Sequence, residues 1–281
     1  MKIDKKILMG LILIAIIAGC IENEETQKTI MVFCGSASKP AMEEAARIFE
    51  EKTDIKVELN FGGSGTMLSQ LKMSKQGDIY SSGSPDYMIK AEKDGVVYPE
   101  TVKKIVYLVP AICVQEDNPK NIQSLEDLTK PGVTVGICAP ESCCVGGYAV
   151  EILEYNNMSE KVKPNIIVHA ESCSKTATLI VMDKVDAIMG WRVFSEWTPN
   201  DTDVVYLKPE ELPSIAYIPI AVSIYTKDRK SAQKFIDFLV SEEGQKIFAR
   251  YGYIATEEEA RKYAPNAQIG GEYELPDNWK T

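Results

Sequence analysis

The sequence predicts a two-lobed α/β fold in which each lobe is a mainly parallel β-sheet covered by helices. Its 281 residues correspond to about two domains of ordinary size. Short apolar runs alternate with stretches of helical periodicity, the pattern of repeated β-loop-α units and of a parallel sheet. Two apolar runs that each contain a proline, residues 105–114 and 217–224, divide these units into two groups. We expect these runs to cross between the lobes.

The first residues are predicted to be an export signal and not part of the fold. Lys2, Lys5 and Lys6 precede an apolar stretch from Ile7 to Ala18, which is too short to cross a bilayer but has the length of a signal-peptide core. The stretch ends in Ile-Ala-Gly-Cys20, which resembles the lipobox of exported lipoproteins, in which the cysteine is lipidated. We predict a signal peptide over 1–19 and a lipid-attached tether over 20–28, with an uncleaved anchor as the alternative.

The charge balance limits the possible partners. Lys and Arg number 31 against 41 Asp and Glu, so the net charge is -10 and a nucleic-acid partner is not expected. A single histidine, His169, removes most His-based metal sites and leaves only one base for a Ser-His-Asp arrangement.

Three β-loop-α units form the first lobe. The apolar run 29–34 precedes a helix whose apolar positions recur at i, i+3, i+4 and i+7, namely Met42, Ala45, Ala46 and Phe49. The second strand alternates over 55–61 and precedes helical residues around 67–71. The third unit has a strand at 78–80, a serine-rich loop at 81–84 and a helix that begins at Pro85.

The second lobe repeats the pattern after the first crossing. A short capped helix at 124–128 precedes a strand at 133–137, and a loop over 138–147 leads to a helix expected to begin at Tyr148. A strand at 166–168, a helix expected to begin at Thr176 and a strand at 185–191 follow. After the return crossing, residues 232–248 have helical spacing.

Four small or hydroxyl-bearing loops precede helices, two in each lobe. They contain Gly35-Ser36, Gly63-Ser64-Gly65, Val145-Gly146-Gly147 and Ser174. Unpaired N–H groups and the helix dipole attract anions at helix starts, and open α/β sheets bind ligands at the carboxyl ends of their strands. Single loops of this kind are often only caps and turns, but four at the same edge predict an anion site between the lobes.

Six cysteines remain after Cys20: Cys34, Cys113, Cys138, Cys143, Cys144 and Cys173. Outside the cell an even number favours disulfides, yet six cysteines allow fifteen pairings between which the sequence does not choose. Buried free thiols are the alternative, and the spacing of Cys138, Cys143 and Cys144 is a weak match to a zinc site.

The sequence resembles the molybdate/tungstate-binding proteins of ABC importers. The similarity is carried by residues 33–42 (FCGSASKPAM), 61–66 (FGGSGT), 77–86 and 185–191 (VDAIMGW), and by the ending 238–245 (FLVSEEGQ). It extends over nearly the whole mature chain. It implies a two-lobed periplasmic-binding-protein-like fold of type II, with no enzymatic activity and no cofactor.

The resemblance also implies the ligand-binding residues. Ser36 and Ser64 match the family's hydroxyl donors, whereas Val145 and a residue among 173–175, here taken as Ser174, match backbone N–H donors of the second lobe. Trp191 stands where many members have a tyrosine, and its indole N–H can also donate. Some archaeal members add two carboxylates around the metal; the corresponding loop here holds Cys143-Cys144, with Glu141 the nearby acid, so a hydrogen-bonded tetrahedral oxyanion is favoured.

We therefore expect an extracytoplasmic lipoprotein that captures molybdate or tungstate between two lobes and delivers it to the membrane permease of an ABC importer. Lobe 1 is predicted over 29–109 and 220–281, and lobe 2 over 110–219. The protein is expected to be a monomer that lipid at Cys20 anchors to the outer face of the cytoplasmic membrane. No metal ion bound by protein side chains is expected. Hinges are expected near 109–111 and 218–220. Sulfate or phosphate binding, or an exported Cys-dependent redox enzyme, are the alternatives.

Overall fold

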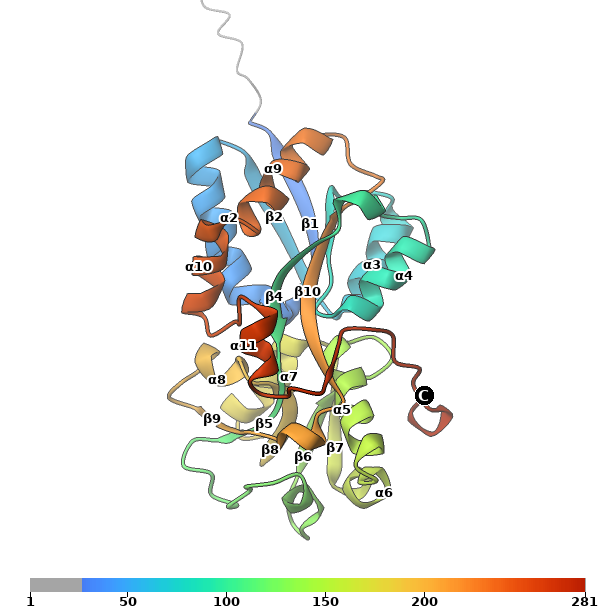
Figure 1. The fold of residues 1–281 in the computed structure, drawn as a ribbon, viewed down its shortest axis with the longest axis vertical. Coiled ribbons are helices and arrows are strands. Elements are labelled where there is room, and N and C mark those ends of the chain that lie inside the picture. The colour runs from blue at the N-terminus through green and yellow to red at the C-terminus, as the bar shows by residue number, and fades with distance from the viewer. Residues whose placement is uncertain (1–26, 281) are drawn as a thin grey trace, which may run out of the picture.

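The computed structural model describes residues 27–280, which form two lobes stacked along the long axis of the molecule (Figure 1). The predicted fold class is confirmed, since each lobe is a β-sheet covered by helices. The predicted signal peptide, Cys20 and most of the tether lie outside the described residues. Within residues 27–280, no helix combines the length and the apolar character needed to cross a membrane.

The first sheet has three neighbouring parallel strands at one side, and the strand next to them runs antiparallel. Its strand order is β11-β10-β3-β1-β2, and β4 also pairs with β10. The strands are β1 (Thr29–Gly35), β2 (Lys56–Gly62), β3 (Ile79–Ser81), β4 (Lys103–Leu108), β10 (Ser214–Val222) and β11 (Gln268–Ile269). The helices of this lobe are α2 (Lys39–Thr53), α3 (Ser64–Ser74), α4 (Pro85–Lys93), α9 (Arg229–Leu239) and α10 (Glu242–Arg250).

The second sheet also has three neighbouring parallel strands, β7, β6 and β8, and β5 runs antiparallel to both β8 and β9, in the order β7-β6-β8-β5-β9. Its strands are β5 (Pro110–Gln115), β6 (Val135–Cys138), β7 (Ile166–Ala170), β8 (Ala187–Trp191) and β9 (Thr202–Val205). The helices of this lobe are α5 (Cys144–Tyr155), α6 (Ser159–Val162), α7 (Cys173–Val181) and α8 (Phe194–Trp197), and α11 (Glu257–Arg261) follows α10 near the end of the chain.

Local sequence explains why these elements form. The apolar stripe of α2 is buried as its spacing predicts, from Ala41 to Phe49, and Pro40 occupies the first turn, where no intrahelical N–H bond is lost. Side-chain caps start several helices: Ser172 accepts from the N–H of Lys175 at α7, and Ser241 accepts from the N–H of Gly244 at α10. These caps fix where the loops end and the helices begin.

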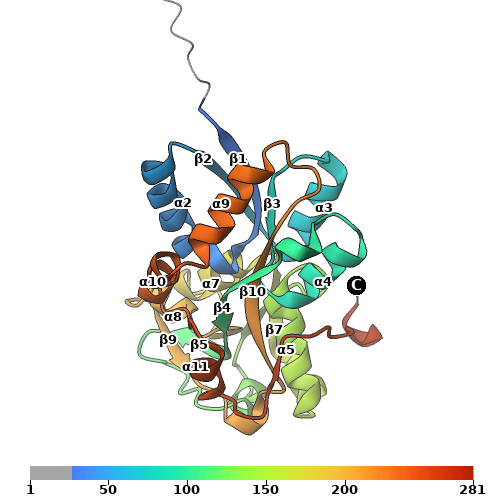
Figure 2. The ribbon, with the colours of Figure 1, turned by 45° about the horizontal axis from the view of Figure 1, so that its top comes forward.

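Two extended segments connect the lobes. β4 belongs to the first sheet and β5 to the second, and Val109 alone separates them. β10 returns the chain, and its register against β4 shifts between Ile218 and Pro219, where proline provides no N–H to the ladder. Figure 2 shows β4 and β10 running together between the lobes.

The C-terminal segment, residues 257–280, which the sequence analysis grouped with the first lobe, contacts both lobes. Ala260 and Ala264 are buried in the same hydrophobic cluster as residues of α5. The Trp279 indole N–H donates to Glu154 on α5 at 2.7 Å, whereas Glu272 pairs with Lys93 on α4 at 2.7 Å. This segment therefore runs along one edge of the boundary between the lobes (Figure 1).

Candidate functional site

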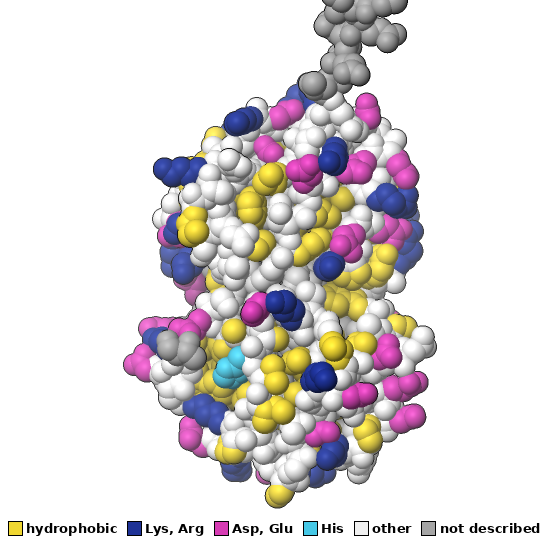
Figure 3. All heavy atoms as spheres, turned by 180° about the vertical axis from the view of Figure 1, so that it is seen from behind, with side chains coloured by type: hydrophobic (Ala, Val, Ile, Leu, Met, Phe, Trp, Pro, Cys, Tyr) yellow, Lys and Arg dark blue, Asp and Glu magenta, His cyan; other side chains and the backbone are white. Residues whose placement is uncertain are grey.

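Loops from both lobes meet at the carboxyl ends of the parallel strands. The first lobe supplies the loops after β1, β2 and β3, and the second lobe supplies the loops after β6 and β7. This is the edge at which open α/β sheets bind ligands, so the expected location of the site follows from the topology. Viewed from behind, the molecule narrows between the two lobes (Figure 3).

Ser36 and Ser174 meet directly across the boundary between the lobes. The backbone N–H of Ser174, in the first turn of α7, donates to Ser36 Oγ at 3.1 Å. Ser36 is 1% exposed, so the hydroxyl of one lobe and the N–H of the other share a site that is withdrawn from bulk water. Two residues that are 138 positions apart in sequence are thereby brought to one point.

Ser64 lies beside this point, at the start of α3. Its Oγ accepts the N–H of Gly83 at 2.9 Å, and Tyr80 donates its hydroxyl to the carbonyl of Ser64 at 2.9 Å. A Cβ added at Gly35, the residue before Ser36, would lie only 2.7 Å from Ser64 Oγ. The absence of a side chain at Gly35 therefore allows the two serine loops to approach each other.

The lobes also contact each other through their backbones. The N–H of Gly65 donates to the carbonyl of Ser142 at 2.9 Å. A Cβ on Gly63 would lie 2.7 Å from the carbonyl oxygens of both Ser142 and Glu171. Glycine at this position is therefore required for the close approach of the lobes.

Val145 and Ser174 lie in first helical turns, which corrects the predicted helix starts. α5 begins at Cys144 and not at Tyr148, so Val145, Gly146 and Gly147 are helical and do not form a preceding loop. α7 begins at Cys173 and not at Thr176. N–H groups in a first turn have no intrahelical carbonyl partner, so both residues keep the geometry of potential anion donors.

Trp191 ends β8 and is fully buried. Its indole Nε1 has no hydrogen-bond partner within the described chain, and its ring packs edge to face on Tyr148 of α5 at 5.0 Å between centroids. The structure thus brings Ser36, Ser64 and Ser174 together, whereas Trp191 is connected to them through α5. A buried N–H that lacks an acceptor costs about 1–3 kcal/mol, which favours a role for Trp191 in which a ligand accepts this hydrogen bond.

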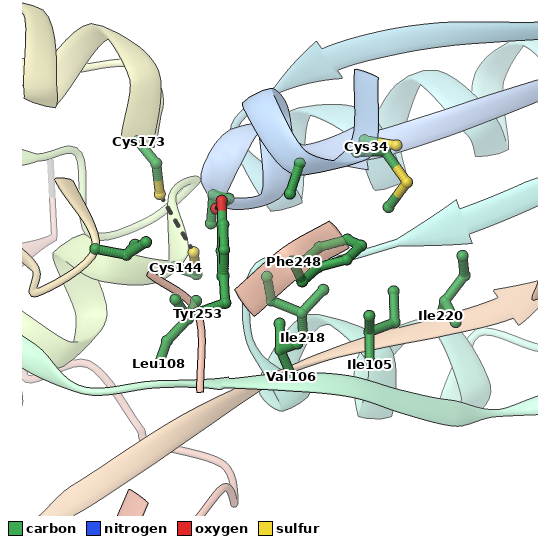
Figure 4. Close-up of a cluster of buried hydrophobic side chains, with 14 of the residues drawn as sticks. Cys34, Ile105, Val106, Leu108, Cys144, Cys173, Ile218, Ile220, Phe248 and Tyr253 are labelled. Atoms are coloured by element: carbon green, nitrogen blue, oxygen red, sulfur yellow. Dashed lines mark hydrogen bonds between the residues drawn. The ribbon is translucent and has the colours of Figure 1, made fainter. Parts of the chain in front are cut away.

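The cysteines are divided between the two alternatives left open by the sequence. Cys138 and Cys143 form a disulfide, and Cys34, Cys113, Cys144 and Cys173 are buried thiols. Cys144 and Cys173 lie side by side at the starts of α5 and α7 (Figure 4). Burial raises the pKa of the Cys113 thiol to about 12. Within residues 27–280, no group of three or more His, Cys, Asp or Glu side chains is placed to hold a metal ion.

A cavity of about 390 Å³ opens beside Cys144 and is lined by α4, α5 and the C-terminal segment. Asp86, in the first turn of α4, faces it, and burial raises the pKa of this carboxyl to about 6 despite the opposing hydrogen bond from Ser84.

The guanidinium of Arg192, the cation next to Trp191 in sequence, donates to the carbonyl of Gly252 at 2.6 Å. The groups at the Ser36–Ser64–Ser174 point are hydroxyls and backbone N–H groups, which are neutral.

Two participants were missed by the sequence analysis. Gly83 supplies an N–H to Ser64, and Ser142 supplies the carbonyl that receives Gly65. The Ser81–Ser84 loop follows β3 at the same sheet edge as the other two loops, and this equivalence was the available signal for Gly83. Nothing local in the sequence marks the carbonyl of Ser142.

Comparison with known proteins identifies relatives over most of the chain. Residues 30–254 match the family described as bacterial extracellular solute-binding protein. A Haemophilus influenzae protein named only as a binding protein is 26% identical over 80% of this chain and 90% of its own length. Molybdate-binding protein ModA of Rhodobacter capsulatus is 24% identical over 87% of this chain and 95% of its own.

Solved structures share the fold. The periplasmic molybdate-binding protein of Azotobacter vinelandii superposes with a TM-score of 0.71 at 14% identity, over 81% of this chain and 100% of that one. The sulfate-binding protein SubI of Mycobacterium tuberculosis has a TM-score of 0.71 at 17% identity, over 86% of this chain and 94% of that one. The predicted resemblance is confirmed, and the chain belongs to the bacterial extracellular solute-binding protein family.

Proposed function

We propose that this protein captures a tetrahedral oxyanion, molybdate or tungstate, between its lobes and delivers it to the membrane permease of an ABC importer. The observation that carries the proposal is the hydrogen bond from the Ser174 N–H to Ser36 Oγ across the lobes, with Ser64 beside it. Hydroxyls and first-turn N–H groups are donors that suit a small ligand with acceptors on every side.

Neutral donors also suit an ion that must be released again. A buried arginine or lysine would add a strong charge pair, whereas hydrogen bonds from both lobes are made when the lobes close and lost when they open. Selectivity for the size of the anion then depends on the distance between the lobes when they close. The name of the Rhodobacter relative supports molybdate.

Sulfate is the second candidate, because a sulfate-binding protein of Synechococcus elongatus is 23% identical over 73% of this chain and 65% of its own. A thermal-shift panel with molybdate, tungstate, sulfate and phosphate at equal concentration separates these ligands. We expect molybdate and tungstate to raise the melting temperature clearly more than sulfate. Equal shifts for sulfate and molybdate would contradict the assignment, and no shift with any of the four would remove the oxyanion function.

We also propose that lipid at Cys20 anchors the protein outside the cytoplasmic membrane. The support is the sequence Ile-Ala-Gly-Cys20 after a short apolar stretch. Cys20→Ser should move the protein from the membrane fraction to the soluble exported fraction without a change in molybdate affinity. Retention of the variant in the membrane would instead indicate an uncleaved anchor.

A further inference from the structure

Two thiols lie in contact at the boundary between the lobes. Cys144 Sγ and Cys173 Sγ are 3.6 Å apart, and each residue is 2% exposed (Figure 4). Both belong to first helical turns, Cys144 in α5 and Cys173 in α7. The next residues are Val145 and Ser174, the two candidate N–H donors of this lobe.

The Cys144 thiol also reaches the first lobe. A Cβ added to Gly83 would lie 2.5 Å from its sulfur and 3.5 Å from Ser64 Oγ, so the sulfur lies against the loop after β3. Cys173 precedes Ser174, whose N–H donates to Ser36. The thiol pair therefore lies among the same groups that carry the proposed anion site.

We propose that Cys144 and Cys173 form a redox modification site whose oxidation weakens anion binding. A small disulfide is the oxidant: one thiolate attacks it to form a mixed disulfide and expels one thiol, and the second thiolate then displaces the other. Two electrons pass from the cysteines to the oxidant, which leaves as two thiols that carry the two protons.

The bond shortens the sulfur separation from 3.6 Å to about 2.05 Å. This movement of about 1.5 Å displaces the first turns of α5 and α7, and with them the N–H groups of Val145 and Ser174.

Closure of the lobes controls when the pair can react. Burial raises the pKa of the Cys144 thiol well above its ordinary value, so in the closed protein this thiol stays protonated and is a poor nucleophile. Opening admits water and the oxidant together. A bound anion that holds the lobes closed therefore protects the pair, a consequence that rests on the proposed function.

A competing reaction starts from the same sulfur. Cys173 Sγ lies 3.8 Å from Cys143 Sγ, which is bonded to Cys138, and attack there would form a Cys143–Cys173 disulfide and free Cys138. This exchange must break an existing bond, whereas oxidation of the nearer Cys144 breaks none in the protein. Disulfide mapping distinguishes the two products.

The test treats the purified exported protein with oxidised glutathione, with and without molybdate, and then maps disulfides and titrates molybdate calorimetrically. We expect a Cys144–Cys173 linkage, a dissociation constant for molybdate raised about tenfold or more, full reversal by dithiothreitol, and at least fivefold slower linkage when molybdate is present. The double variant Cys144→Ser/Cys173→Ser, which lacks both thiols, should show equal affinity before and after oxidation. Cys113 is a buried thiol in β5, and the control variant Cys113→Ser should form the same linkage and lose the same affinity as the parent.

The outcomes separate the two proposals. A Cys143–Cys173 product, no linkage, or a linked protein with unchanged affinity would overturn the modification site. If the reduced parent binds none of the four oxyanions, the proposed function and the effect on binding both fail, and the mapping alone then decides whether the pair is oxidised.

Discussion

Ser64→Ala is the substitution that tests the anion site most directly. Ser64 is 1% exposed at the start of α3, and its Oγ accepts the Gly83 N–H at 2.9 Å. The hydroxyl has one proton of its own to donate, which is the proton that an oxyanion would receive. Alanine removes both the acceptor for Gly83 and the donor for the ligand.

The loss of ligand binding and the loss of stability are measured separately. A hydrogen bond to a charged group contributes roughly 1.5–3 kcal/mol, which corresponds to about a 10- to 150-fold rise in the dissociation constant. The Gly83 N–H, left without its acceptor, lowers the free energy of unfolding by about 1–3 kcal/mol. Calorimetric titration with molybdate measures the first effect, and urea denaturation without ligand measures the second.

Ser69→Ala is the matched control in the same helix. Ser69 is exposed in the interior of α3, so alanine there should change affinity less than about twofold and leave stability equal or slightly higher. If Ser64→Ala lost stability but bound molybdate as tightly as the parent, the hydroxyl would serve only Gly83. The anion site would then have to be sought away from this loop.

Three further substitutions test closure, the buried indole and a buried carboxyl. Gly63→Ala places a Cβ against two carbonyl oxygens of the other lobe. We therefore expect molybdate affinity to fall at least about tenfold, and X-ray scattering to report an open molecule even with saturating ligand. Gly147→Ala is the control, because nothing lies within 4 Å of its added Cβ, and it should close like the parent. Trp191→Phe removes an N–H that has no partner in the described chain. It should weaken molybdate binding about tenfold and change the free energy of unfolding by less than about 1 kcal/mol. Unchanged affinity would assign the ring to packing alone. The folded-state pKa of Asp86, about 6, lies above its ordinary 3.8, so its contribution to stability is complete below pH 3.8 and is lost as pH rises through 6. Asp86→Asn should therefore flatten the stability profile between these pH values and gain about 1–2 kcal/mol at pH 7, an allowance reduced for the partial exposure of the residue; a parallel profile in denaturation measurements would refute this.

The parts of the fold that could be predicted from sequence are those with a local physical cause. The apolar stripe of α2 predicted its buried face, and the order of apolar runs and helical stretches predicted two covered sheets. The convergence of serine loops followed from the rule that parallel strands end at one edge. Ser36 and Ser174 were therefore predicted as partners of one site although 138 positions separate them.

The parts that could not be predicted depend on tertiary contacts. Gly146 suggested a loop, but it lies inside α5, where a Cβ would meet the carbonyl oxygen of Cys138 at 2.3 Å. Glycine is needed there because two segments approach each other closely, and no local sequence pattern predicts that contact. The Cys138–Cys143 pairing needed a position in space for each sulfur, since the sequence allowed fifteen pairings.

We expect the C-terminal segment to make the proposed closure of the lobes sensitive to ionic strength. Glu272 of this segment pairs with Lys93 of the first lobe, while Trp279 holds the segment to the second lobe. The side chains of Lys93 and Glu272 are 64% and 50% exposed, so the pair contributes at most about 1 kcal/mol and is screened by salt. That energy corresponds to at most about a fivefold preference for closed lobes in dilute buffer, and we expect this preference to decrease as the salt concentration rises.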